Sequence, residues 1–268
     1  MINGNILDNS SGWLIFSISL ILMFGGNFLG YRLGLWHKKK IPDALDTANT
    51  EILGAIFVVL GLILAFLFGM SLNRLEHKKE MVLTEASAIL TAYQNSQFLP
   101  EPHKTNSGKM LKEYASLRYE LAVNARKDRN IKALREGIIR CERMQDSLLQ
   151  EALAVKNIQE ADVSVFFESI SAIIDINMRR INNSIGDRIP VALKVLMYIM
   201  TLLSLVAMGY GSGLKGGHSI IPNFILVAVF ATIIWIIIDM DHPANLLFRV
   251  NQQPMLDVIH RINTMQFG

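Results

Sequence analysis

Residues 52–72 form an uninterrupted apolar stretch, and no other feature constrains the fold of this chain as strongly. The stretch contains no ionisable side chain. As an α-helix rising about 1.5 Å per residue, it is long enough to cross a hydrocarbon core of about 30 Å. The residues after it keep apolar side chains at helical spacing and contain no proline or glycine before residue 100. The sequence therefore predicts one continuous helix over about 52–93, half in the membrane and half in water.

Two rows of side chains run along residues 52–72 at helical spacing. Small residues recur at every fourth position, so they share one side of a helix and let a neighbouring helix approach closely. This small row is Gly61, Ala65 and Gly69. A bulkier row lies beside it and comprises Leu60, Leu64 and Phe68.

Three further apolar blocks predict membrane helices, at about 13–30, 190–210 and 220–238. The first block differs from a signal peptide because no basic residue precedes it. Its glycines either weaken its last turn or permit close packing; they are Gly25, Gly26 and Gly30. Residues 31–51 are predicted to form a polar link, and the glycines between 209 and 217 a short turn. A hydrophobic fraction of 51% with only 18% charged residues agrees with an integral membrane protein.

Residues 73–189 are predicted to be a water-soluble helical bundle inserted between the second and third membrane helices. Pro100 and Pro102 end the long helix, because proline cannot donate to a helical ladder. One-sided apolar stripes then predict helices at about 107–124 and 130–155, and another that begins near residue 159. The chain should therefore be an all-α membrane protein with four transmembrane helices in two pairs. The four predicted parts are 1–72, 73–189, 190–238 and an amphipathic tail over 239–268.

Polar groups at the ends of the membrane helices are the candidate site residues. A polar ring just below the second span would consist of Asn73, Arg74 and Glu76. Three potential cation ligands follow the fourth span, namely Asp239, Asp241 and His242. This second group either binds a divalent cation or simply ends a helix at the water boundary, since two carboxylates do not fill the six or more positions that calcium takes. Lys194, one turn inside the third span, either snorkels to the interface or lines a pore.

The sequence carries no motif of a catalytic site. It contains no phosphate-binding loop, dinucleotide-binding glycine turn, zinc-protease helix or serine-hydrolase elbow. Its single cysteine, Cys141, is most simply a small apolar residue in a helix. A net charge of +3 is too small and too dispersed to indicate a nucleic-acid partner. We expect no enzyme activity, no catalytic residue, no cofactor and no bound metal.

Short motifs spread over most of the chain resemble those of the bestrophin-like membrane proteins of bacteria. In order, they include Gly54-Ala55, Arg74 with Glu76, Leu99-Pro100-Glu101-Pro102, Arg188-Ile189-Pro190 and Asp239-Met240-Asp241-His242-Pro243. The resemblance implies a distant relationship to true bestrophins, which are pentameric ion channels with a narrow apolar neck on the second helix. The acidic run that forms the calcium clasp of animal bestrophins is missing here, so calcium gating is not expected.

The resemblance implies a homo-oligomeric, pentameric ion channel in the bacterial inner membrane, in contact with lipid and inorganic ions. The bulky row from Leu60 to Phe68 would form the neck while the small row packs neighbouring subunits, or the two rows would exchange these roles. A non-conducting structural or force-coupling oligomer is the alternative function. A transporter is less favoured, because no broken span carries a charge at mid-depth.

The charges flanking the spans give conflicting indications of membrane orientation. The first loop contains Arg32 and three lysines at 38–40, which favours placing that loop inside. The long helix is followed by Arg74, Lys78 and Lys79, which favours placing the helical insert inside. We expect the insert and both termini to be cytoplasmic, on the flanking charges and on the resemblance.

Overall fold

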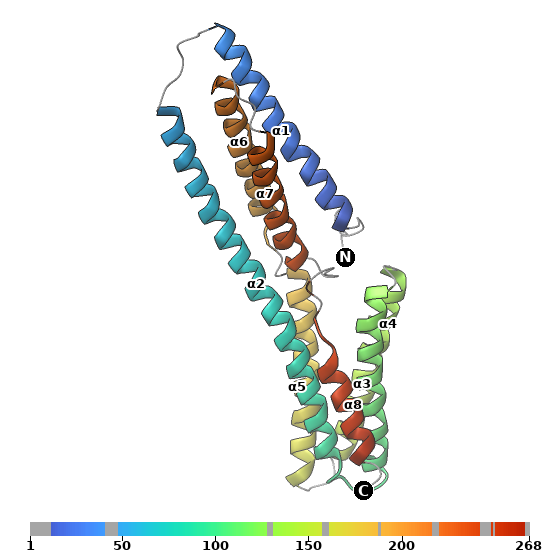
Figure 1. Cartoon of the computed structure of the whole chain (residues 1–268). Helices are drawn as coiled ribbons and strands as arrows, with labels where there is room; N and C mark the ends of the chain where they lie inside the picture. The colour runs from blue at the N-terminus through green and yellow to red at the C-terminus, as the bar shows by residue number, and fades with distance from the viewer. Residues whose placement is uncertain are drawn as a thin grey trace. The chain divides into compact units, whose positions relative to one another are not determined.

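The structure is a computed structural model that describes residues 12–40, 48–127, 131–156, 161–186, 189–215, 220–241, 248 and 250–265 (Figure 1). All regular secondary structure in these residues is α-helical, as the sequence predicts. The helices are α1 (Gly12–Lys40), α2 (Ala48–Ser96), α3 (His103–Lys127), α4 (Ile131–Lys156), α5 (Ala161–Gly186), α6 (Val191–Lys215), α7 (Ile220–Asp241) and α8 (Gln253–Met265).

The chain divides into two compact units. Unit 1 comprises Met1–Leu75 and Arg188–Phe248, and unit 2 comprises Glu76–Asp187 and Arg249–Gly268. Within the described residues, four helices are long and apolar enough to cross a membrane, which confirms the predicted number of spans. These candidate spans are Phe16–Lys40, Glu51–Ser96, Val191–Lys215 and Ile221–Asp241.

Helix α2 is the long helix that the sequence predicts. It contains 49 residues, which corresponds to roughly 70 Å of helix and more than twice the thickness of a hydrocarbon core. Its apolar stretch over 52–72 therefore belongs to the membrane, while the residues after Leu75 contribute to unit 2.

Helices α1 and α6 pack side by side in unit 1 through glycine. A Cβ atom built on Gly30 would lie 2.0 Å from the carbonyl oxygen of Val206, and one on Gly209 would lie 2.0 Å from that of Asn27. Only glycine lets the two backbones approach this closely. Residue numbers increase together along the two helices, from Gly26 beside Leu202 to Gly34 beside Gly213, so α1 and α6 run parallel. Of the two roles left open for Gly30, the structure therefore supports close packing. A Cβ atom built on Gly25, in contrast, would meet no described atom of another helix within 4 Å.

This packing corrects two predicted boundaries. Helix α1 continues to Lys40, so residues 31–40 are helical and not part of a polar link. Helix α6 continues to Lys215, so Gly209 and Gly213 lie inside a helix and not in a turn. In both cases the glycines that suggested a break are held helical by the neighbouring helix.

Helices α2 and α7 also contact each other in the core of unit 1. The rings of Phe57 and Phe230 stack with centroids 6.0 Å apart. The hydroxyl of Ser71 donates to the carbonyl of Ile237 at 3.3 Å. These contacts fix which side of α2 faces the interior of its own subunit.

Unit 2 is a helical bundle with one continuous apolar core. Helix α3 packs against α4, α4 against α5, and α8 against α3. The core includes Tyr93, Phe166 and Ile170 together with Met255 and Ile262 from α8. The amphipathic tail thus buries its apolar side in the same core as the insert.

Candidate functional site

The side of α2 that carries Leu60 and Leu64 faces the interior of unit 1. Leu60 is 0% exposed and Leu64 is 4% exposed, and both pack in the core that contains Val227 and Phe230 of α7. A side chain buried in its own subunit cannot also line a lumen. Leu60 and Leu64, two of the three predicted neck residues, therefore pack inside their own subunit, and only Phe68 of that row is exposed.

The small row lies on a free side of α2. Gly61, Ala65 and Gly69 are exposed, and a Cβ atom on either glycine would meet no atom within 4 Å. None of the described residues of the subunit packs against the two glycines of this row.

A third row, which the sequence analysis did not single out, is the most exposed bulky part of α2. Val58 is 73% exposed, Leu62 72% and Phe66 65%. They recur at every fourth position, and Leu62 lies two residues from buried Leu60, about 200° around the helix. The sequence gives no signal for this row, because residues 52–72 are apolar on every side and only the packing of α7 distinguishes the sides.

Asp241, at the end of α7, is held by two basic side chains. Lys194 Nζ lies 2.6 Å from Asp241 Oδ2, and Arg74 contacts Asp241 Oδ1. The backbone N–H of Ile189 donates to Asp241 Oδ1 at 3.0 Å. The carboxylate is almost fully buried, so these three partners offset the cost of removing its charge from water. The cluster joins α2, α6 and α7 within unit 1.

This cluster revises the interpretation of the polar candidates. Of the three residues predicted for a polar ring, Arg74 pairs with Asp241, whereas Asn73 and Glu76 are exposed. Lys194 also pairs with Asp241, and its side chain is 24% exposed. No group of three metal-ligating side chains occurs in the part of the chain that the structure describes. Asp239 is buried, and His242 lies outside the described residues.

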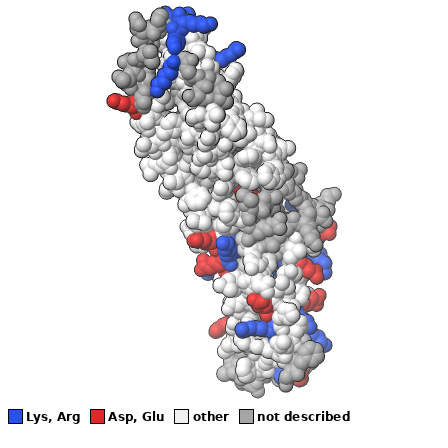
Figure 2. Space-filling model, viewed as in Figure 1, with Lys and Arg blue, Asp and Glu red and all other residues white. Residues whose placement is uncertain are grey.

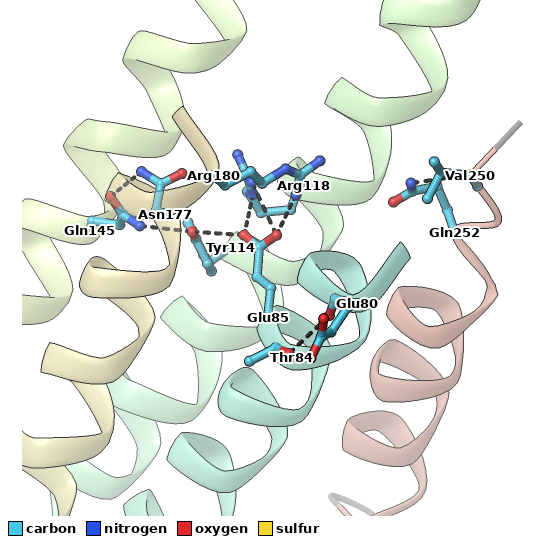
Figure 3. A network of polar contacts seen from close by, with 10 residues as sticks. All are labelled: Glu80, Thr84, Glu85, Tyr114, Arg118, Gln145, Asn177, Arg180, Val250 and Gln252. Carbon is cyan, nitrogen blue, oxygen red and sulfur yellow. Dashed lines mark hydrogen bonds and ion pairs between the residues drawn. The ribbon is translucent and has the colours of Figure 1, made fainter. Parts of the chain in front are cut away.

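A second charged cluster lies inside unit 2 (Figure 3). Glu85 of α2 is fully buried and accepts hydrogen bonds from Arg118 Nε at 2.5 Å and Arg118 NH2 at 3.1 Å. Arg180 of α5 also pairs with Glu85. Burial alone would raise the pKa of the Glu85 carboxyl, but the two guanidinium groups outweigh it and hold that pKa below its usual range.

Neutral polar groups extend this cluster across the bundle. The Tyr114 hydroxyl donates to Glu85 at 3.4 Å, Gln145 donates to Tyr114 at 2.9 Å, and Asn177 donates to Gln145 at 2.9 Å. The network therefore joins α2, α3, α4 and α5. We call these residues, together with Arg118 and Arg180, the Glu85 network.

Residues 28–255 match the model of the Bestrophin-like domain family. The chain belongs to the bestrophin-like family. No curated protein matches it.

Solved bestrophin structures share the fold of this bestrophin-like chain. A variant of the bacterial bestrophin homologue from Klebsiella pneumoniae superposes with a TM-score of 0.68 at 12% identity, covering 97% of this chain and 100% of that chain. Another variant of the same homologue gives 0.64 at 13% identity, covering 94% and 98%. A structure described as a membrane protein gives 0.67 at 11% identity, with the same two coverages of 94% and 98%. These matches confirm a multi-pass membrane fold, and the family model confirms the predicted family.

Proposed function

We propose that this protein is an oligomeric ion channel whose neck is lined by Val58, Leu62 and Phe66 of α2. The observation that carries the proposal is the exposure of this apolar row on the side of α2 that faces away from the core of its own subunit. A lumen at the centre of an oligomer requires such a free side. The family membership supports the channel function, and the neck position is our inference from exposure.

A ring of such side chains acts as a hydrophobic constriction. Apolar side chains do not replace the hydration shell of an ion, so a narrow apolar ring empties of water and stops conduction until it widens. The adjacent small row, Gly61, Ala65 and Gly69, would let the neighbouring subunit approach closely. We propose a pentamer in the bacterial inner membrane, with unit 2 and both termini in the cytoplasm.

The mouth below the neck would carry negative charge. Glu76 follows Val58 by eighteen residues, which is five helical turns, so both lie on the same side of α2. Glu76 and Asn73 are exposed, while the nearby Arg74 is directed to Asp241, with which it pairs. A carboxylate ring raises the local concentration of cations, so we propose that the channel prefers cations.

Single-channel recording in planar bilayers tests the neck. Leu62→Ala should enlarge the current or hold the channel open, because it removes the bulk at the centre of the row. Leu203→Ala on α6 is the matched control, since Leu203 is the same residue type and is also more than half exposed. Phe68→Ala tests the row predicted from sequence, to which Phe68 belongs, against the exposed row that contains Leu62.

Three results decide between the interpretations. Currents that change with Leu62→Ala and not with Leu203→Ala support the neck. Currents that respond only to Phe68→Ala would keep the channel but refute this neck. Silence from a preparation shown to be oligomeric would favour a non-conducting, force-coupling oligomer, for which the continuity of α2 between the two units is the supporting observation.

A further inference from the structure

The parallel packing of α1 and α6 brings the C-terminal ends of both helices together. Gly34 and Gly213 are in contact near these ends, where a Cβ atom on Gly34 would lie 2.9 Å from the Cα of Gly213. A hydrogen bond of 2.5 Å between His37 and the hydroxyl of Tyr210 joins the helices at the same level. Side chains at the end of α1 and the end of α6 therefore belong to one surface of unit 1.

This surface is basic. Its cations are Arg32, Lys38, Lys39 and Lys40 on α1 and Lys215 on α6. Figure 2 shows Lys and Arg gathered at this end, next to a body of unit 1 that is almost free of charge. The five cations outnumber the acidic residues of the adjoining sequence, which are Asp43, Asp46 and Glu51. We call this set of five cations the basic collar.

Aromatic rings lie under the cations of the collar. Lys40 Nζ lies 4.1 Å from the ring centroid of Trp36, and Arg32 Cζ lies 5.6 Å from that of Phe28. Both rings are more than half exposed. An exposed tryptophan on a membrane helix lies at the level of the lipid headgroups, so the collar lies at that level too.

Neutralisation of helix ends does not account for the whole collar. Cations in the last turn of a helix stabilise its negative end, which applies to the three lysines at 38–40 and to Lys215. That effect falls off within the last turn. Arg32 lies two turns before the end of α1, too far to stabilise that end. It is nevertheless exposed, and its guanidinium group lies over the ring of Phe28.

We propose that the basic collar binds the phosphate groups of anionic phospholipids in the adjoining leaflet. Two of its cations stand over rings that lie among the headgroups, and Lys or Arg held near a surface of anionic lipid is attracted to it. The long stems of these side chains lie along apolar surface while their charges reach the phosphates. Neutral headgroups of the same size offer no net charge to bind.

Lipid titration of the purified full-length protein in detergent tests this site. Thermal unfolding and native mass spectrometry are followed while phosphatidylglycerol or phosphatidylcholine is added. The test variant replaces three lysines, Lys38→Gln, Lys39→Gln and Lys40→Gln. The control removes the same charge from exposed positions of unit 2, with Lys109→Gln, Arg135→Gln and Arg140→Gln.

The wild type and the control should retain bound phosphatidylglycerol in native mass spectrometry, and the lipid should raise their melting temperatures. High salt should abolish this stabilisation. Each cation contributes roughly fivefold to binding, so the collar variant should lose roughly a hundredfold in affinity for phosphatidylglycerol. Equal stabilisation by both lipids, or equal losses in the two triple variants, would overturn the proposal. Neither readout depends on whether the protein conducts ions.

Discussion

The substitution Glu85→Gln should open unit 2, because it removes the only carboxylate of the Glu85 network. Glutamine keeps the volume of the side chain but leaves buried Arg118 and partly exposed Arg180 without a counter-charge. Removing one partner of a buried ion pair costs about 3–5 kcal/mol. We expect the free energy of opening of unit 2 to fall by that amount.

Cys141 provides an internal reporter for this measurement. It is the only cysteine, it is 1% exposed, and it lies in the core of unit 2. Burial raises the pKa of its thiol, so the folded protein presents an unreactive protonated group. Labelling by a thiol reagent therefore reports the fraction of time for which unit 2 is open.

Since every 1.4 kcal/mol is a factor of ten, Glu85→Gln should accelerate labelling of Cys141 by roughly 10²–10⁴. Arg180→Gln should have a smaller effect than Arg118→Gln, because the Arg180 side chain is 28% exposed and that of Arg118 only 7%. Glu120→Gln, an exposed position on α3, is the control. A labelling rate for Glu85→Gln within a few-fold of the control would refute the argument that this network stabilises unit 2.

Three further predictions follow from the same structure. The pKa of Glu85 is lowered in the folded protein, so its contribution to stability is present above the unfolded pKa of about 4.3 and is lost as the pH falls through the folded pKa. Helicity measured by circular dichroism should therefore decrease in acid, and it should decrease less in Glu85→Gln. Gly30→Ala should lower the melting temperature in detergent because its Cβ meets the Val206 carbonyl, whereas Gly25→Ala should leave it unchanged or slightly higher; equal effects would contradict the close packing of α1 and α6. Glu76→Gln should reduce the cation-to-anion permeability ratio by roughly tenfold, measured from the reversal potential in a salt gradient; an unchanged ratio would remove Glu76 from the conduction path.

The helices and their polarity could be predicted from sequence because hydropathy and periodicity are local properties. The long helix α2 followed from an apolar stretch whose continuation over 73–99 contains no proline or glycine. The ends of α1 and α6 could not be predicted in this way. Gly30 and Gly209 look like helix breakers in isolation, and only their contact with each other's helix shows that they are packing positions.

The orientation of side chains on α2 depends on a partner distant in sequence. Leu60 and Leu62 are the same residue type two positions apart, yet one is buried and the other is 72% exposed. A helix that is apolar on every side carries no moment that would indicate this difference. Glu85 did carry a signal, because it is a charge within the apolar row of Val82, Ala86 and Ile89, and such a residue usually has a buried partner.

The Asp241 cluster leads to a last prediction, on divalent cations. The two oxygens of Asp241 are already engaged by Lys194, Arg74 and the N–H of Ile189. A cation could bind there only by displacing basic groups of the protein itself, and they would repel it. Calcium should therefore not raise the melting temperature of the wild type in detergent.

Asp241→Asn should lower that melting temperature, because Lys194 and Arg74 lose their counter-charge, whereas Asp257→Asn on the exposed side of α8 should not. Stabilisation of the wild type by calcium that disappears in Asp241→Asn would show that Asp241 is a metal ligand. It would also show that the ion cluster rearranges when the metal binds. If calcium has no such effect, Lys194 and Arg74 supply the positive charge that a bound metal ion would otherwise supply to the buried carboxylate of Asp241.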